Sequence, residues 1–293
     1  MDGVIVVDKA QGWTSHDVVG KMRRIAGTRR IGHLGTLDPM ATGVLPLVID
    51  RATRLAQFFV KNDKLYEGTV RFGLATNTYD AEGTPTSELR PFLATPELIE
   101  PLLAPFRGTF AQTPPPVSAK KVGGQPAYKL ARKNIQVELK PVEITVHELV
   151  LLGCEGADVR IRVHCSAGTY LRAIAHELGQ AAGVGAHLSA LRRLRAGDFS
   201  IERAHTLDQL QELASAGRLA EALLPGAELL PEFPSYVVDR ITESQIRQGR
   251  DFRTSPFRTP ADARYVKAVT EDGVLLAVGE ARLPNLYHPM LVL

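Results

Sequence analysis

The feature that most constrains this chain is a glycine-rich run, Gly32 to Leu45, that contains a single carboxylate, Asp38. The run is Gly-His-Leu-Gly-Thr-Leu-Asp-Pro-Met-Ala-Thr-Gly-Val-Leu. Pro39 disfavours helical geometry at Asp38, and the glycines allow the backbone to approach a ligand closely. An Asp-Pro turn is the ordinary interpretation of this dipeptide. The other interpretation, which the rest of the chain favours, is a reactive carboxylate at the lip of a cleft.

Positive charge gathers in three stretches that have no acidic residue, although the net charge is only +3. Local positive faces of this kind suit a phosphate backbone, while ordinary solvated faces would have the same composition. The stretches are Val18 to Leu37 (Lys21, Arg23, Arg24, Arg29, Arg30), Gln112 to Val137 (Lys120, Lys121, Lys129, Arg132, Lys133) and Leu178 to Gly197 (Arg192, Arg193, Arg195).

The cysteines and the apolar segments indicate where such a chain works. Cys154 and Cys165 form no metal-spaced pair, and 293 residues need no disulfide to fold, which favours a reducing compartment. The apolar run Val4 to Val7 is too short for a signal peptide, and no stretch approaches the roughly 20 apolar residues of a membrane span. We therefore expect a cytoplasmic protein that does not bind membranes.

Hydrophobic patterning predicts an α+β fold with a mixed or antiparallel sheet. Thr14 or Ser15 can cap a helix that ends at Gly27. The other expected elements are strands at Val4 to Val7, Tyr66 to Leu74 and Val159 to Cys165, and a helix at Leu171 to Leu178.

The last 60 or so residues look like a separate small unit. Prolines 225, 231 and 234 mark a linker, and Tyr265 to Thr270 with Val274 to Val278 predict a β-hairpin. A unit of this size is marginal alone, so it should pack on the larger one. We expect domains at 1–230 and 231–293, with a long surface loop at about 112–135.

Five blocks of the sequence together resemble one family, the TruB-type tRNA pseudouridine synthases, which isomerise uridine 55 in the T-arm of tRNA. Ala10 stands where that family usually has proline. The blocks, in family order, are Lys9 with Gly12, Thr14 and Ser15; Gly32 to Leu45; Lys64-Leu65-Tyr66; Cys165-Ser166-Ala167-Gly168-Thr169-Tyr170-Leu171-Arg172; and Leu191-Arg192-Arg193.

This resemblance implies a pseudouridine-synthase catalytic domain followed by a small, mostly β, PUA-like RNA-binding domain. It makes Asp38 the catalytic carboxylate, Arg172 its cation, and Tyr66 the group that stacks on uracil and acts in proton transfer. The further roles that it implies are pocket lining for Tyr170 and Leu191, support of the active loop for Asp80, and filling of the space left by a flipped uridine for His33.

The chemistry of the residues fits that assignment. Breaking a bond between sugar and base builds positive charge on the sugar, which one ionised carboxylate can stabilise or capture. A hydrolase normally adds a second acid, and the acids nearest to Asp38 in sequence are Asp17 and Asp50. A lone carboxylate favours an isomerase, although another acid could arrive from elsewhere in the fold. To stay ionised in a water-poor pocket, Asp38 needs a cation.

The expected partner is tRNA, contacted at the T-stem-loop by a monomer with no obligate protein partner. In the family the insertion at about 112–135 clamps the RNA, and Lys120, Gly124, Tyr128, Ala131 and Arg132 fit its pattern. No metal is expected, because His164 and Cys165 are adjacent on a strand and point to opposite faces, and no second pair has ligand spacing. No cofactor is expected either, since Gly123-Gly124 lacks the Lys-Ser/Thr ending of a phosphate loop. The residues expected to grip phosphates are Lys9, Lys21, Arg23, Arg24, Lys120, Lys121 and Arg132.

A second hypothesis is an RNA-binding or RNA-folding protein that keeps this fold without essential turnover. Basic faces would serve it equally well. A buried pair of Asp38 and Arg172 beside Tyr66 would distinguish the two, because binding alone has no use for it. Guide-RNA-dependent relatives share these motifs, but nothing here resembles their extra partner-binding extensions, which favours a stand-alone enzyme.

Overall fold

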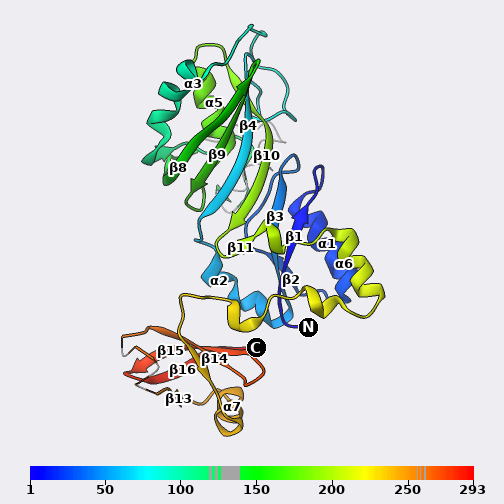
Figure 1. The fold of residues 1–293 in the computed structure, drawn as a ribbon, viewed down its shortest axis with the longest axis vertical. Helices are drawn as coiled ribbons and strands as arrows, with labels where there is room; N and C mark the ends of the chain where they lie inside the picture. Colours follow the sequence, from blue (N-terminus) through cyan, green and yellow to red (C-terminus); the bar gives the residue numbers. More distant parts are fainter. Residues whose placement is uncertain (119–120, 123–124, 127–138, 256, 258, 261) are drawn as a thin grey trace.

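The computed structural model describes residues 1–118, 121–122, 125–126, 139–255, 257, 259–260 and 262–293. Lys120, Gly124, Tyr128, Ala131 and Arg132 lie outside the described residues, and for Lys121 only the backbone is described. The molecule is elongated, with the C-terminal part at one end (Figure 1).

The larger part is built on a nine-stranded mixed sheet in the order β1-β3-β10-β4-β9-β8-β5, with β2 beside β3 and β11 beside β10. Its strand pairs are antiparallel except for β10 and β3, which run parallel. The strands are β1 (Gly3–Lys9), β2 (Ile31–His33), β3 (Thr42–Ile49), β4 (Lys64–Phe72), β5 (Gly108–Gln112), β8 (Val142–Glu155), β9 (Asp158–Cys165), β10 (Ala186–Ala196) and β11 (Phe199–Ser200). A separate short hairpin joins β6 (Lys121–Val122) to β7 (Gln125–Pro126).

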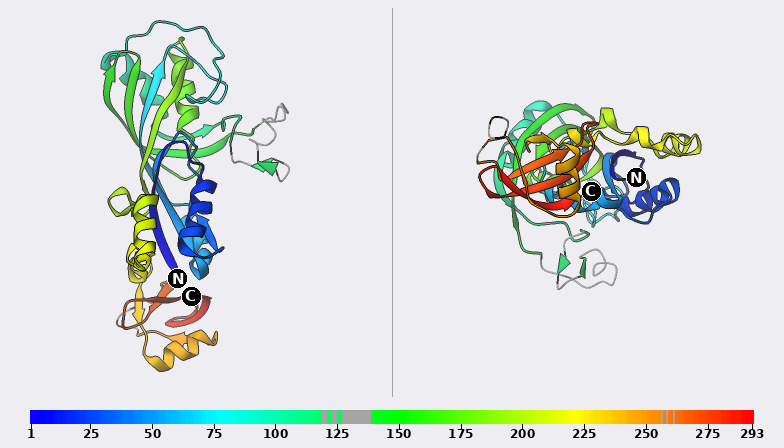
Figure 2. Two further views of the ribbon diagram at one scale, coloured as in Figure 1. Left: turned by 90° about the vertical axis from the view of Figure 1, so that its right-hand side faces the viewer. Right: turned by 90° about the horizontal axis from the view of Figure 1, so that it is seen from below.

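Helices cover the sheet in two groups. The helices α3 (Pro96–Leu103) and α5 (Leu171–Ala181) lie behind β8, β9 and β4, while α1 (Ser15–Ala26) and α6 (Leu207–Ser215) pack together beside β1 (Figures 1 and 2). Short helical segments complete this part: α2 (Ala56–Phe59), η1 (Asp50–Leu55), η2 (Ala104–Phe106), η3 (Ile201–Arg203), η4 (Leu219–Ala222) and η5 (Gly226–Glu228). No helix in the described part of the chain is long and apolar enough to cross a bilayer.

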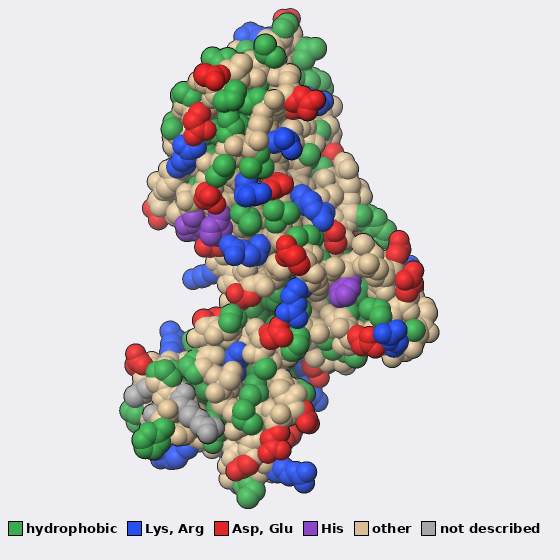
Figure 3. Space-filling view, in the orientation of Figure 1, with side chains coloured by type: hydrophobic (Ala, Val, Ile, Leu, Met, Phe, Trp, Pro, Cys, Tyr) green, Lys and Arg blue, Asp and Glu red, His purple; other side chains and the backbone are tan. Residues whose placement is uncertain are grey.

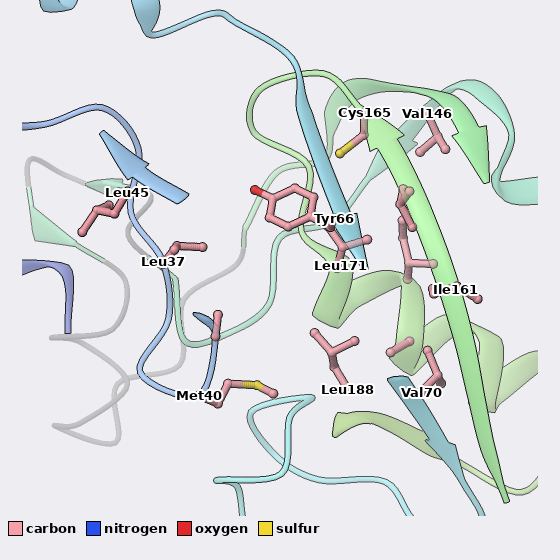
Figure 4. Close-up of a cluster of buried hydrophobic side chains, with 14 of the residues drawn as sticks. Leu37, Met40, Leu45, Tyr66, Val70, Val146, Ile161, Cys165, Leu171 and Leu188 are labelled. Carbon is pink, nitrogen blue, oxygen red and sulfur yellow. The ribbon is translucent and has the colours of Figure 1, made fainter. Parts of the chain in front are cut away.

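One apolar cluster lies between the sheet and these helices, and it extends to the loop that carries Asp38. Figure 4 shows Leu37 and Met40 of that loop on one side of the Tyr66 ring, with Leu171 and Ile161 on the other. Both flanks of Asp38 are therefore anchored by burial: Leu37 and Met40 are each 4% exposed.

Local sequence explains α1, whose ends agree with the prediction. Thr14 forms a capping box with Asp17, and Gly27 ends the helix in the left-handed conformation, with φ of 63°. Val18, Val19 and Met22 face the core.

The C-terminal part is a five-stranded sheet in the order β12-β14-β15-β16-β13, with helix α7 (Arg240–Arg247) beside it. The predicted hairpin is present as β14 and β15. Phe58 of the larger part packs edge-on against Phe233 and Tyr265, at centroid distances of 5.3 and 5.6 Å, so the small unit leans on the large one. The strands are β12 (Ser235–Val237), β13 (Phe252–Arg253), β14 (Tyr265–Val269), β15 (Leu275–Leu283) and β16 (Leu286–Val292).

Candidate active site

Asp38 lies in the loop between β2 and β3, and the start of α1 and the turn before it hold the backbone on both sides of this residue. The Ser15 hydroxyl accepts a hydrogen bond from the Leu37 N–H at 2.8 Å and donates one to the Leu37 carbonyl at 3.1 Å. The Gly12 N–H donates to the Pro39 carbonyl at 2.8 Å. These hydrogen bonds fix the backbone of the loop without using the Asp38 side chain, which can therefore face a ligand.

Arg172, in the first turn of α5, pairs with Asp38. Its Nε lies 2.8 Å from Asp38 Oδ2, in an ion pair whose N–H is not aligned well enough for a good hydrogen bond. The Arg172 side chain is 4% exposed and that of Asp38 is 36% exposed. The carboxylate thus contacts a buried cation while one side of it still reaches solvent. Sequence reasoning expected this pairing.

Asp80 provides a second carboxylate near Arg172. Asp80 Oδ2 lies 3.5 Å from Arg172 Nη1, and the Asp80 side chain is 6% exposed. Arg172 also donates to the carbonyls of Thr78, at 2.9 Å, and Val117, at 3.0 Å. Asp38 has no acidic neighbour in sequence, but the fold brings Asp80 to the same arginine. The sequence had left open that another acid could arrive from elsewhere in the fold.

A cleft of about 240 Å³ opens in front of this pair. Tyr170 and Leu191 line it, as expected, together with Tyr66 and Asp38. Its other lining residues are Gly35, Thr36, Leu37, Val60, Lys64, Ser166, Ala167, Gly168, Thr169, Leu171, Arg172 and Arg193.

Tyr66 is the aromatic side of the cleft. It is 8% exposed on β4, and its hydroxyl points toward the Leu37 side, away from Ile161 (Figure 4). Burial raises the pKa of the Tyr66 hydroxyl, and the guanidinium of Arg193 opposes that rise. Arg193 is the antiparallel partner of Tyr66 on β10, so the cation sits beside the ring by strand register.

Sequence reasoning misplaced Arg193, which we had assigned to a basic surface. It is 1% exposed and forms no ion pair among the described residues. Its guanidinium donates instead to the carbonyls of Val44 at 2.7 Å, Gly35 at 3.0 Å and Thr36 at 3.4 Å. The signal that could have found it is strand alternation, which puts Arg193 on the opposite face from Arg192.

Lys9 is a second correction. It is fully buried, and its Nζ donates to the carbonyls of Trp13 at 2.7 Å, Ala10 at 3.0 Å and Pro39 at 3.2 Å. Burial lowers the pKa of this ammonium to about 8. The prediction that Lys9 grips a phosphate is wrong, because its side chain is buried and its donors are used on the carbonyls of Ala10 and Trp13 in its own turn and of Pro39 in the loop that carries Asp38.

The cations of α1 remain at the surface. Arg23 and Arg24 are exposed, although Arg23 also donates to the Ile31 carbonyl at 3.3 Å. Lys21 is half-buried and donates to Gln211 at 3.3 Å. Arg24 lines an open hollow of about 730 Å³ with Trp13 and His16. These three side chains can reach a polyanion without breaking the core.

Four arginines line another open hollow, of about 720 Å³, beside the C-terminal strand. Arg29 and Arg30 belong to the first basic stretch. Arg51 and Arg54 lie in η1, where Asp50, Ala52 and Thr53 stand beside and between them, so the sequence shows no basic cluster there. By contrast, charges of both signs mix over the face of the sheet that Figure 3 shows. On β4 and β9, Arg71 pairs with Asp158 and Arg162 pairs with Glu67.

His33 lies at the end of β2 and is half-buried. Its Nδ1 has no hydrogen-bond partner in the described part of the structure, and burial lowers the pKa of its imidazole. Nothing among the described residues therefore ties that nitrogen down. No group of three or more His, Cys, Asp or Glu side chains within the described ranges is arranged to hold a metal ion.

Sequence comparison gives one family over most of the chain. Residues 23–171 match the TruB family pseudouridylate synthase N-terminal domain, and residues 172–230 match the tRNA pseudouridylate synthase B C-terminal domain. A protein of Solibacter usitatus named tRNA pseudouridine synthase B is 60% identical over 293 residues, which cover 100% of both chains. Another of that name, from Thermobifida fusca, is 50% identical over 96% of this chain and 95% of its own.

Solved structures give the same answer for the fold. A chain in the structure titled "Structure of H/ACA RNP bound to a substrate RNA containing 2'-deoxyuridine" has a TM-score of 0.71 at 25% identity, covering 99% of this chain and 84% of that chain. A chain in a Cbf5-Nop10-Gar1 complex has a TM-score of 0.69 at 27% identity, covering 97% of this chain and 79% of that chain.

Proposed function

The chain belongs to the TruB family of pseudouridine synthases, and we propose that it converts uridine 55 in the T-arm of tRNA to pseudouridine with Asp38 as the reacting carboxylate. It has the pseudouridine-synthase fold and is an isomerase that modifies tRNA. The position of the uridine and the roles of individual residues are part of the proposal. So are a catalytic domain at 1–230, a PUA-like domain at 231–293, a monomeric state and a cytoplasmic location.

The reaction moves one bond and adds no water. The bond from N1 of uracil to C1′ of ribose breaks, the base turns, and C1′ joins C5. The proton on C5 is lost, and N1 gains one. Positive charge that develops at C1′ requires an anion close by, and Asp38 supplies it as a nucleophile or as a counter-charge.

The observation that carries this proposal is the ion pair between Asp38 and Arg172 at the lip of the cleft. A guanidinium beside a carboxylate favours its ionised form, which is the form that the reaction needs. Because Asp38 remains 36% exposed, it can contact a nucleoside without giving up Arg172. Asp80 and the carbonyl of Thr78 hold the other side of Arg172, so we assign both a supporting role.

Tyr66 is proposed to stack on the uracil and then to accept the proton from C5. The ring lines the cleft with Asp38, which fits stacking on the base that leaves the sugar. Arg193, next to it on β10, favours a negative charge on the Tyr66 oxygen. Because burial raises the pKa of the phenol, Tyr66 has to release its own proton to solvent as it takes the one from C5, so it relays a proton during the reaction.

A uridine inside a folded loop must leave its stack to enter the cleft, at a cost of a few kcal/mol. We propose that His33 fills the space that it leaves and that the cations of α1 grip the RNA backbone. Arg29, Arg30, Arg51 and Arg54 extend that positive surface toward the C-terminal part. Lys120, Lys121 and Arg132 are proposed phosphate contacts from the loop whose side chains are not described.

The test replaces Asp38 by asparagine. Asp38→Asn should abolish pseudouridine formation in an unmodified tRNA transcript, mapped by carbodiimide primer extension, while the dissociation constant for tRNA stays within about threefold. Asp272→Asn is the matched control, because Asp272 is exposed in the turn between β14 and β15 and should keep full activity. A transcript with cytidine at position 55 should not react.

Turnover retained by Asp38→Asn would refute the assignment of this residue. Tight tRNA binding by a wild-type protein that forms no pseudouridine would favour the second hypothesis, an RNA-folding protein without essential turnover.

A further inference from the structure

The turn that carries Asp80 is fastened to α5 by two stacked rings outside the cleft lining. The rings of Tyr79 and His176 lie 3.8 Å apart, centroid to centroid, with an interplanar angle of 10°. Both side chains are half-buried. Burial lowers the pKa of His176, so the ring that stacks is neutral near pH 7. Nδ1 of His176 has no hydrogen-bond partner among the described residues. The imidazole is therefore oriented on that side by its stack with Tyr79 and not by a hydrogen bond.

The stack lies one helical turn from Arg172. His176 follows Arg172 by four residues in α5, and side chains at that spacing share a helix face. The two neighbours of Tyr79 both contact the Arg172 guanidinium: the Thr78 carbonyl at 2.9 Å and the Asp80 carboxylate at 3.5 Å. Tyr79 thus sits between two residues that hold the cation of Asp38.

Tyr79 adopts a backbone conformation that its side chain does not favour. Its φ is 65°, in the left-handed region where a bulky residue is rare. Such strain persists only where the surroundings impose it, and here they do. The Tyr79 carbonyl accepts from the Leu188 N–H at 3.0 Å, and the Ala81 N–H donates to the Leu188 carbonyl at 3.1 Å. With this backbone held on β10, the stack with His176 directs the ring onto α5.

We propose that Tyr79 and His176 are a positioning pair for the reaction: their stack holds the Thr78–Asp80 turn on α5, and this fixes the Arg172 guanidinium against Asp38. Neither ring contacts the substrate. The proposal rests on the proposed function, because it assigns both residues to the step that Asp38 performs. A role in folding alone would lower the stability of the protein. A positioning role predicts a lower rate of pseudouridine formation in a folded protein whose affinity for tRNA is unchanged.

The experiment compares substitutions that keep a ring with substitutions that remove it. Tyr79→Phe and His176→Phe keep a stack and should retain the single-turnover rate of pseudouridine formation. Tyr79→Asn suits the left-handed backbone but has no ring, so the turn stays unstrained while the stack is lost. Tyr79→Asn and His176→Ala should each lower the rate by roughly fivefold, which is the size of a typical aromatic coupling. The dissociation constant for tRNA should not change.

Two further measurements make the result decisive. The double variant Tyr79→Asn with His176→Ala should be no slower than the slower single variant, since the two rings act as one unit. The side-chain Nε–Hε NMR signal of Arg172 should shift in Tyr79→Asn and stay in place in Tyr79→Phe. Every rate is measured at a temperature at which circular dichroism shows the variant fully folded.

Wild-type rates in Tyr79→Asn and His176→Ala, or additive losses in the double variant, would overturn the proposal. The NMR signal separates this outcome from failure of the proposed function. If the wild-type protein formed no pseudouridine, an Arg172 signal that moves with loss of the ring would still support the positioning, and one that does not move would refute it.

Discussion

Two pairs of cations carry the same charge in opposite surroundings. Lys9 and Arg193 lie beside the loop around Asp38, and Arg29 and Arg51 line the outer hollow. The first two are buried and donate to backbone carbonyls in the loop around Asp38 and in the segments next to it. The other two are exposed, and no side-chain partner is described for them. The same residue types thus do two jobs: the buried cations hold the backbone around Asp38, and the exposed ones are free for a polyanion. Substitutions should separate the two jobs.

The largest effect should come from Arg193→Met. Three carbonyls, those of Gly35 and Thr36 in the loop and of Val44 in β3, would lose a buried donor, at about 1 to 3 kcal/mol for each group left unsatisfied. We expect the free energy of unfolding to fall by about 3 kcal/mol and the rate of pseudouridine formation to fall with it, measured by urea denaturation and by single-turnover assay. Arg195→Met is the control, since Arg195 is exposed on the same strand. Equal stability of the two variants would remove the distinction between buried and exposed cations.

A smaller effect, confined to binding, should follow from Arg29→Gln combined with Arg51→Gln. Both side chains line the open hollow. We expect affinity for tRNA to fall roughly tenfold and the slope of log affinity against log salt to decrease by about 2, because each cation that meets a phosphate releases counterion. Filter binding at several salt concentrations measures both. Arg160→Gln, on the mixed-charge outer face of the sheet, should leave the slope unchanged. If the double variant kept the wild-type slope, this hollow would not belong to the RNA surface.

The smallest effect is the pH dependence of stability through Lys9. Burial lowers the pKa of its ammonium from 10.5 to about 8, so between these values the unfolded chain binds more protons than the folded one. Stability from this group therefore rises with pH across that window. Relative to Lys9→Met, the wild-type protein should gain about 1 kcal/mol of unfolding free energy between pH 8 and pH 9. Urea denaturation at both pH values measures it, and parallel pH curves for the two proteins would contradict the assignment.

The parts of the fold that depend on neighbours in sequence were predictable. The capping residues of α1 and the glycine that ends it act within one turn, and the hairpin of β14 and β15 follows from a turn between two apolar runs. The closeness of Asp38 and Arg172 was expected only through the resemblance to a family. No local pattern links residues so far apart.

The surroundings of the site depend on how the strands cross. Tyr79 lies on α5 because the turn that carries it is bonded to Leu188 of β10. Lys9 and Arg193 look like surface cations in sequence, and their burial follows from strand pairing that puts their side chains under the loop around Asp38. Predicting them would have required the sheet order, which composition and periodicity do not supply.

The parallel pairing of β10 with β3 has a consequence for synthesis on the ribosome. β10 fills the gap between β3 and β4, so both strands keep an unpaired edge until residues 186–196 emerge. Such edges template intermolecular association. We expect a nascent chain that stalls before residue 186 to expose both unpaired strand edges at once, so that slower translation up to that point should lower the yield of folded protein.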